Sequence, residues 1–391
     1  MDVERLRQSP IGKLVEITGV DPRTMRDYAY KAFVPEPLPT QPALTHATWN
    51  AASDAAGALG RLKQVCAHLP NPQLLIAPAL AKEAQATSAL EGTYGALPDV
   101  LEARLPGFEP RTPEIKEINA YERMATLAFD WISDREIALT MLADLQGILA
   151  RASRRPSLDP GKIREHQVII GPEDCAIEDA RFIPPPPDDR LRSGLDAWEA
   201  WVRKDHDLPV VIRAALAHYQ FETLHPFGDC NGRVGRLVVV LQLLRAGALD
   251  EPSLTISPWL LRRRDQYQEH LLTTSTSGDW NPWVRFFARG VTEQALSHVE
   301  VAKQLLDWAA DVRGQLLERH WTGTIASVAE NLIEWPVVTN TLLQQRFGVT
   351  APTGQSAIDR LVDLGVLSEM TGKTYGRIYG ASHVISLVES L

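Results

Sequence analysis

The sequence predicts an all-α protein in which a helical core carries one β-hairpin flap and is followed by a winged-helix domain. Three observations predict this fold. Apolar residues recur at spacings of three and four along most of the chain, as they do on the buried face of a helix. Two short β-prone runs flank a Gly-Pro turn between His166 and Pro187, and after Arg319 short helices precede two short strands.

The length of the chain and changes in its sequence pattern divide it into three regions. With 391 residues it is too long for one compact core, so two or three domains are expected. Residues 1–112 are predicted to be a helical region, interrupted by the proline-rich extended segment FVPEPLPTQPAL at Phe33–Leu44. Residues 113–318 are predicted to form the core, and residues 319–391 the winged-helix domain.

Three segments are expected to be core helices. Glu114–Ile132 and Val210–Leu224 have the helical period, and Gly232–Gly247 is apolar on nearly every face. The last of these is therefore expected to be a buried central helix. Residues 163–187 are expected to lie outside the helices as a hairpin flap, because four consecutive prolines at their end stop further strand pairing.

The C-terminal region has the element order of a winged helix. A first helix is followed by the turn GVTAPTGQ and the helix SAIDRLVDLG. Two short strands around a Gly-Lys turn then follow in LSEMTGKTYGRIYGA.

Composition and charge restrict the function classes. A net charge of −9 argues against a chain-wide electrostatic grip on nucleic acid or anionic lipid. No apolar run reaches the roughly 18 residues of a membrane-spanning helix, and the opening MDVERLRQSP has no hydrophobic signal segment. Cys66, Cys175 and Cys230 are too few and too scattered for a disulfide framework or a zinc site, so a cytoplasmic location without a membrane partner is expected.

The stretch HPFGDCNGRVGR, His225–Arg236, is placed at the start of the predicted buried helix. A helix N-terminus offers backbone N–H groups and a partial positive charge to an anion, and Gly232 allows close approach to the backbone. Arg233 and Arg236 are three residues apart, so both can reach the same anion. Two arginines beside such an anion site indicate a polyphosphate.

Two further residues add metal-binding and catalytic chemistry. Asp229 is placed to hold Mg²⁺, which accompanies nucleotide phosphates through one or two carboxylates. His225 ends the preceding helix, and a neutral imidazole facing the phosphates is a natural general base for a hydroxyl nucleophile. A lone histidine at a helix end is usually a cap, and paired arginines usually belong to a solvated face. Here the arginines begin a helix that should be buried, so their charges need partners, which favours the anion site.

HPFGDCNGRVGR resembles the signature of the Fic family, His-Pro-Phe-x-(Asp/Glu)-Gly-Asn-Gly-Arg-x-x-Arg, and departs from it at one fixed position. The resemblance implies an all-helical core with a hairpin flap that transfers AMP from ATP to a hydroxyl group of a target protein. It implies that ATP and a target protein docked on the flap are the partners. The implied roles are general base for His225, Mg²⁺ ligand for Asp229, α- and β-phosphate contacts for Asn231, Gly232 and Arg233, γ-phosphate contact for Arg236, and core anchor for Phe227.

A second segment, EAQATSALEGTYGAL (Glu83–Leu97), is similar to the inhibitory segment of Fic proteins, (Ser/Thr)-x-x-x-Glu-(Gly/Asn). Thr87, Glu91 and Gly92 occupy its fixed positions. A helix over about residues 80–92 that ends at Gly92 presents Glu91 at its tip. Alone, this short pattern is more typical of a capped amphipathic helix. Beside the core motif it implies autoinhibition, in which Glu91 takes the Arg236 guanidinium that the γ-phosphate needs.

Cys230 stands where the Fic signature has a glycine whose N–H lines the phosphate site. If φ is positive there, cysteine costs about 1 kcal/mol or more of strain. If φ is negative, its N–H can still line the phosphate site, and its side chain narrows the pocket.

CNGRVGR also has the Cys-x5-Arg spacing of cysteine phosphatases, and a thiol at a helix N-terminus should be nucleophilic. Against a phosphatase, a helix and Asp229 precede the cysteine instead of a buried strand, and Leu237 follows Arg236.

DNA-binding regulation is the second function class. Residues 325–391 contain four Lys/Arg against six Asp/Glu, and SAIDRLVDLG has one arginine and two aspartates. Phosphate neutralisation dominates DNA affinity, so this composition favours protein contacts for the winged helix, although Lys373 and Arg377 in the wing leave DNA open. The sequence also leaves open the target protein, a homodimer, and removal of AMP as a second activity.

Overall fold

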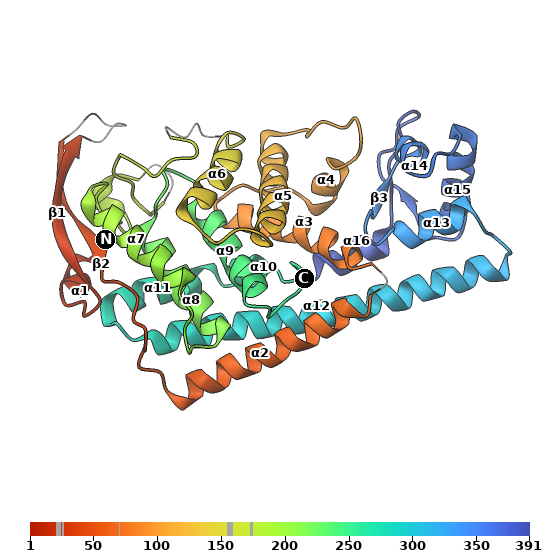
Figure 1. The fold of residues 1–391 in the computed structure, drawn as a ribbon. Helices are drawn as coiled ribbons and strands as arrows, with labels where there is room; N and C mark the ends of the chain where they lie inside the picture. The colour runs from red at the N-terminus through yellow and green to blue at the C-terminus, as the bar shows by residue number, and fades with distance from the viewer. Residues whose placement is uncertain (21–24, 26, 70, 155–158, 173–174) are drawn as a thin grey trace. The chain divides into compact units, whose positions relative to one another are not determined.

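The computed structural model describes the chain except residues 21–24, 26, 70, 155–158 and 173–174. It is mostly helical, with a two-strand hairpin and a small C-terminal three-strand sheet (Figure 1). The chain forms two compact units whose segments alternate along the sequence. The first contains Met1–Gly57, Arg123–Ala248 and Arg262–Thr292, and the second contains Ala58–Glu122, Leu249–Leu261 and Glu293–Leu391. The division after residues 112 and 318 stays a prediction.

The first unit holds the N-terminal hairpin and the helices on either side of HPFGDCNGRVGR. Its elements are α1 (Val3–Arg7), β1 (Gly12–Val20), β2 (Asp27–Pro35), α6 (Leu139–Ala150), the 3-10 turn Ile177–Asp179, α7 (Asp189–Arg203), α8 (Val210–Leu224), α9 (Asn231–Arg245) and α11 (Arg264–Ser277). The second unit holds α3 (Gln73–Leu90), α4 (Leu97–Glu102) and the C-terminal elements. Four helices include residues of both units: α2 (His46–Ala67), α5 (Pro113–Ile132), α10 (Ser257–Arg262) and α12 (Trp280–Glu318).

The three predicted core helices are confirmed as α5, α8 and α9. Every residue of α9 from Asn231 to Leu243 is buried, as its continuous apolar pattern predicts. Aromatic side chains pack around α8: Trp198 of α7 lies 5.2 Å from the ring of Phe221, and the Trp283 indole N–H donates to the Ala215 carbonyl over 2.8 Å. These contacts fix the α8–α9 pair inside the first unit.

A two-strand hairpin lies near the N-terminus, outside the predicted flap of residues 163–187. β1 and β2 pair antiparallel from Gly12–Pro35 to Val20–Asp27, in a region predicted to be helical. In the described part of residues 163–187, the only strand pairing is one isolated bridge between Ile170 and Phe182. In the described residues the predicted flap is thus limited to this one bridge, and the flap itself stays a prediction.

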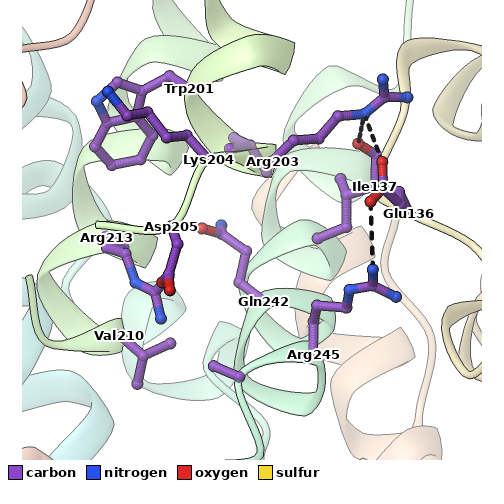
Figure 2. Close-up of a pocket in the computed structure, with 12 residues that line it drawn as sticks. Glu136, Ile137, Trp201, Arg203, Lys204, Asp205, Val210, Arg213, Gln242 and Arg245 are labelled. Carbon is purple, nitrogen blue, oxygen red and sulfur yellow. Dashed lines mark hydrogen bonds and ion pairs between the residues drawn. The ribbon is translucent and has the colours of Figure 1, made fainter. Parts of the chain in front are cut away.

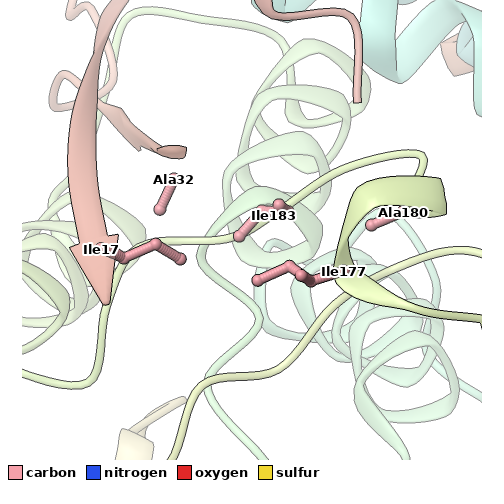
Figure 3. Close-up of a cluster of buried hydrophobic side chains, with 5 residues drawn as sticks. All are labelled: Ile17, Ala32, Ile177, Ala180 and Ile183. Atoms are coloured by element: carbon pink, nitrogen blue, oxygen red, sulfur yellow. The ribbon is translucent and has the colours of Figure 1, made fainter. Parts of the chain in front are cut away.

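Packing explains why the β-prone runs of residues 163–187 have a single bridge. Ile177, Ala180 and Ile183 of the loop form one buried cluster with Ile17 and Ala32 of the hairpin (Figure 3). The backbone N–H of Phe33 also donates to the Ile183 carbonyl over 2.9 Å. The β-prone side chains of the loop are thus buried against another sheet, so the loop gains its apolar burial without forming strands of its own.

The C-terminal region has the predicted order of elements. α13 (Thr324–Asn331), β3 (Val337–Val338), α14 (Asn340–Phe347), α15 (Ala351–Asp363), β4 (Ser368–Glu369), β5 (Tyr379–Gly380) and α16 (Ser382–Glu389) follow in turn, and the strands form one sheet in the order β3-β5-β4. α15 begins inside the predicted turn, because Thr350 caps it and proline occupies its first turn. None of the described helices is long and apolar enough to cross a membrane.

Candidate active site

The turn between α8 and α9 brings the motif residues together within the first unit. Among the described non-glycine residues, positive φ occurs at Met25, His225, Cys230 and His320, so two of these four outliers lie in this one turn. Positive φ is costly for residues with a Cβ and persists only where surrounding contacts enforce it. Such strain marks the turn as a candidate functional site.

His225 is the left-handed C-cap of α8, with φ 50° and ψ 64°. Its backbone N–H donates to the Phe221 carbonyl over 2.9 Å. Its ring Nδ1 lies 3.2 Å from the Glu222 carbonyl oxygen. Because a carbonyl can only accept, this bond assigns the proton to Nδ1 and the lone pair to Nε2. The half-buried ring is therefore held in the tautomer that can accept a proton at Nε2.

Asn231 clasps the turn with its side chain. Its Oδ1 accepts from the Phe227 N–H and its Nδ2 donates to the Phe227 carbonyl, each over 2.8 Å. Phe227 is fully buried and its ring lies 6.3 Å from that of Phe221, as expected for a core anchor. With the amide so engaged, the contribution of Asn231 to an anion would come from its backbone N–H in the first turn of α9.

Arg233 and Arg236 are both 2% exposed at the start of α9. Cys230, the left-handed N-cap of α9 with φ 70°, is also buried, and its Sγ lies 3.3 Å from Nη2 of Arg233. The positive-φ alternative considered for this cysteine is thus the one that the fold adopts. Two guanidinium groups withdrawn from solvent at a helix N-terminus form a strongly electropositive position.

Asp229 is the more accessible acid of the turn, with a side chain 39% exposed. Its Oδ1 accepts from the Cys230 N–H over 2.6 Å, and Ser153 Oγ lies 3.4 Å from Oδ2. Arg233 Nη2 lies 4.0 Å from Oδ1. In the part of the chain that the structure describes, no group of three His, Cys, Asp or Glu residues could hold a metal ion by itself.

Arg164 holds the turn through hydrogen bonds, and the sequence analysis did not predict this role. It is 2% exposed, its Nε donates to the His225 carbonyl over 2.8 Å, and its Nη2 donates to the Pro185 carbonyl over 2.6 Å. Its backbone N–H donates to the Pro226 carbonyl over 2.9 Å. Burial lowers the pKa of Arg164 to about 10, partly offset by the charge of Asp188, so it stays cationic at neutral pH.

Gln146 supports the other end of the turn in the same way. This fully buried residue of α6 donates from Nε2 to the Asp229 carbonyl over 3.1 Å and accepts from the Gly161 N–H over 2.7 Å. Neither Arg164 nor Gln146 belongs to a short motif. Their importance comes from partners about 60 to 80 positions away in the sequence.

The predicted inhibitory segment lies in the second unit, whereas the α8–α9 turn lies in the first. α3 ends at Leu90, with Glu91 as C-cap and Gly92 at φ +85°. The N–H of Thr93 donates to the Ser88 carbonyl and that of Gly92 to the Ala89 carbonyl, the two bonds of a Schellman cap. Thr87 is buried and Glu91 is exposed, so the predicted helix end at Gly92 is confirmed, and the pairing of Glu91 with Arg236 stays a prediction.

Comparison with protein families places these elements. The Fic/DOC family model matches residues 136–243, and the Fic/DOC family N-terminal model matches residues 49–130. The chain is a Fic/DOC family protein. The Fic-domain match includes the whole α8–α9 turn, and the N-terminal match includes α3 and Glu91.

The Fic domain is distantly related to named enzymes. The proteins called protein adenylyltransferase Fic from Drosophila melanogaster and Drosophila sechellia are each 36% identical over 141 residues, which cover 36% of this chain. The match spans only about a quarter (25%) of the length of these relatives.

Two solved structures share the fold. A Fic family protein from Desulfovibrio desulfuricans G20 superposes with a TM-score of 0.53 at 20% identity, over 87% of this chain and 98% of that one. A Fic domain containing signaling protein from Bacteroides thetaiotaomicron has a TM-score of 0.51 at 17% identity, over 64% of this chain and 97% of that one. At these identities the likeness concerns the Fic fold alone.

Proposed function

We propose that this protein is an adenylyltransferase that transfers AMP from ATP to a hydroxyl group of a target protein. One observation supports this most directly: the fixed tautomer of His225 lies in the same short turn as two buried arginines at the N-terminus of α9. A base and an electropositive anion site are the two requirements for attack of a hydroxyl on a phosphate. The distant relation to adenylyltransferases supports the same activity.

In the proposed reaction, His225 Nε2 takes the proton of the target hydroxyl as its oxygen attacks the α-phosphorus. The bond from that phosphorus to the bridging oxygen breaks, and pyrophosphate leaves. Backbone N–H groups of Asn231 and Gly232, at the start of α9, and the Arg233 guanidinium would hold the α- and β-phosphates, and Arg236 the γ-phosphate. Cys230 would form a wall of the site.

Asp229 would hold Mg²⁺ in this proposal. Its half-exposed carboxylate suits Mg²⁺, which takes hard oxygen ligands and usually binds one or two carboxylates together with phosphates and water. When bound, the ion would neutralise charge that develops on the phosphates.

Incubation with α-labelled ATP and Mg²⁺, followed by mass spectrometry of the protein and of added cell extract, tests the proposal. His225→Ala should reduce labelling at least ~100-fold, the loss typical of a general base. His68→Ala is a matched control, because His68 directly follows α2, away from the α8–α9 turn in sequence, and its Nδ1 also contacts a backbone carbonyl, that of Gln64, at 2.7 Å. Labelling by His225→Ala equal to that of the unaltered protein would contradict the mechanism.

DNA binding by the C-terminal region has less support. Of its four cationic residues, Arg346 lies 3.8 Å over the ring of Trp335 and Arg360 lies 5.2 Å over that of Trp321. Guanidinium groups stacked on tryptophan are less available to phosphates. Lys373 and Arg377 in the wing are exposed, and a salt-dependent mobility-shift assay with duplex DNA would test them.

A further inference from the structure

A pocket lies in the first unit, at the opposite end of the α8–α9 pair from His225. Its volume is about 330 Å³, within the range of small-molecule sites. It is lined by the end of α7, the start of α8 and the last turn of α9 (Figure 2). Because α8 has 15 residues that each rise about 1.5 Å, its two ends are separated by roughly 20 Å. The pocket is therefore not part of the proposed catalytic turn.

The lining is cationic although the chain has a net charge of −9. Arg203, Lys204, Arg213 and Arg245 line the pocket, and its only carboxylates are Glu136 and Asp205. Glu136 lies between Arg203 and Arg245, 3.5 Å from each (Figure 2). Arg203 also pairs with Glu199, outside the lining, at 3.0 Å, which leaves one cation in excess of these carboxylates, and a local excess of cations attracts anions.

Arg213 is the best-placed cation for a ligand. Its Nε is buried and has no hydrogen-bond partner. Its ion partner Asp205 is 3.8 Å away on Nη1, and the Asp205 side chain is fully solvent-exposed, so this pair is weak. The Arg213 side chain is 23% exposed, so a bound oxyanion would meet its Nη groups in a charge-assisted hydrogen bond.

The start of α8 adds to this preference. Pro209 is its N-cap, and no side chain caps this helix end, while Val210 lines the pocket. The positive end of the α8 dipole thus lies beside Arg213. Gln242 of α9, drawn between Arg213 and Arg245 in Figure 2, offers an amide to the same space.

We propose that this pocket binds a small organic phosphate, with its phosphoryl group against Arg213 and the start of α8. A phosphate monoester carries roughly −1.5 to −2 charges at pH 7, so the cationic lining attracts it. The volume exceeds that of a phosphoryl group, and the organic part would lie along Trp201 and Ile137. This site is independent of the proposed AMP transfer.

Calorimetric titration of the full chain with glycerol 3-phosphate, inorganic phosphate and glycerol tests the proposal. Glycerol 3-phosphate should bind and glycerol should not. Arg213→Gln should weaken binding about tenfold or more, as expected for loss of a charged hydrogen bond. Lys204→Glu, at an exposed position that leaves the fold intact, should weaken it as well. Arg192→Gln changes an exposed arginine of α7 outside the pocket and should leave binding unchanged.

The outcomes separate this pocket from the α8–α9 turn. If glycerol 3-phosphate binds with equal affinity to the unaltered protein, Arg213→Gln and Lys204→Glu, the phosphate is bound elsewhere and the proposal fails. Absence of binding to the unaltered protein also overturns it. If inorganic phosphate binds as tightly as glycerol 3-phosphate, the organic part contributes nothing and the assignment to an organic phosphate fails. Melting curves show whether Arg213→Gln remains folded, and Lys204→Glu decides if it does not.

Discussion

Cys230 holds a left-handed backbone conformation, φ 70° and ψ 12°, that favours glycine. We predict that Cys230→Gly raises the free energy of unfolding by about 1 kcal/mol, because it removes the Cβ strain of this conformation. Urea denaturation of both proteins measures the difference. AMP transfer should be retained or increased, since glycine is the residue that the Fic signature has at this position.

Cys230→Ala is the control for this prediction. It removes the thiol and its contact with Arg233 but keeps a Cβ at positive φ, so it should give no stabilisation. Equal stabilisation by alanine and glycine would show that the thiol, and not the backbone conformation, lowers the free energy of unfolding. Hydrolysis of a phosphotyrosine analogue by the unaltered protein, lost in both variants, would support the phosphatase alternative instead.

Arg164 would be a positioning residue in the proposed reaction, because it bonds to the backbone of the α8–α9 turn. We predict that Arg164→Gln lowers the rate of labelling by roughly 100-fold, because an error of about 1 Å at the base suffices for such a loss. The ATP dissociation constant should change much less, since Arg164 bonds to the backbone carbonyls of Leu224, His225 and Pro185. Single-turnover rates and calorimetry separate the two quantities. An equal loss of ATP affinity would mean that the whole site collapses.

At the scale of elements, α3 ends in a glycine cap that presents Glu91 at an exposed position. We predict that Glu91→Gly raises self-labelling by one to two orders of magnitude, because under the predicted pairing Glu91 and a γ-phosphate would compete for the Arg236 guanidinium, which always stays charged. Arg236→Ala should abolish the gain. The measurement is labelling with α-labelled ATP over a range of concentrations.

A control for Glu91→Gly should replace another exposed glutamate of the second unit. Glu83 also belongs to α3, but it is buried and accepts from the backbone N–H groups of Ile256 and Ser257 over 3.1 and 3.0 Å, so Glu83→Gly would disturb the fold. Glu109→Gly is better matched, since Glu109 is an exposed glutamate outside any helix of the same unit. Equal activity of the unaltered protein and Glu91→Gly would show that the segment is only a capped helix.

The loop at residues 163–187 is a second element with a proposed role, docking of a target segment as an added strand. Ile170 directs its N–H and carbonyl to Phe182, at 2.8 and 2.9 Å, so in an antiparallel pair Ile169 directs its own outward. We predict that Ile169→Pro abolishes labelling of proteins in cell extract and leaves ATP affinity intact. Ile170→Pro, which removes the bridge itself, is the comparison. Loss of ATP binding in Ile169→Pro would make the loop structural.

At the scale of the molecule, each compact unit contains a buried neutral histidine. Burial lowers the pKa of His218 in the first unit to about 3 and that of His298 in the second to about 4. The unfolded chain therefore takes up protons below about pH 6.5 that the folded chain does not. Stability should be complete above that pH and fall as the pH is lowered to about 4 for His298 and about 3 for His218, by about 2 kcal/mol per histidine at pH 5.

Urea denaturation at pH 7.5 and pH 5 measures this loss. His218→Gln should reduce the pH dependence, because glutamine does not titrate. His46→Gln, at an exposed histidine of α2, should leave it unchanged. Equal loss of stability in His218→Gln and the unaltered protein would show that carboxyl groups, and not this histidine, control acid unfolding.

The sequence by itself determined the features that depend on neighbours along the chain. The period of apolar residues located α5, α8 and α9, the glycine at position 92 located the end of α3, and HPFGDCNGRVGR located the turn with His225 and the two arginines. These predictions are confirmed because helical hydrogen bonds, caps and short motifs connect residues only a few positions apart.

Only the tertiary structure decided the rest. The backbone of Cys230 is left-handed because the turn is clasped by Asn231 and fastened by Arg164 and Gln146, whose partners lie far away in sequence. The β-prone runs before Pro187 have one bridge instead of two strands, because their apolar side chains pack on the hairpin of residues 12–35. Burial against distant segments, which no local pattern encodes, determines which of several locally acceptable conformations a segment adopts.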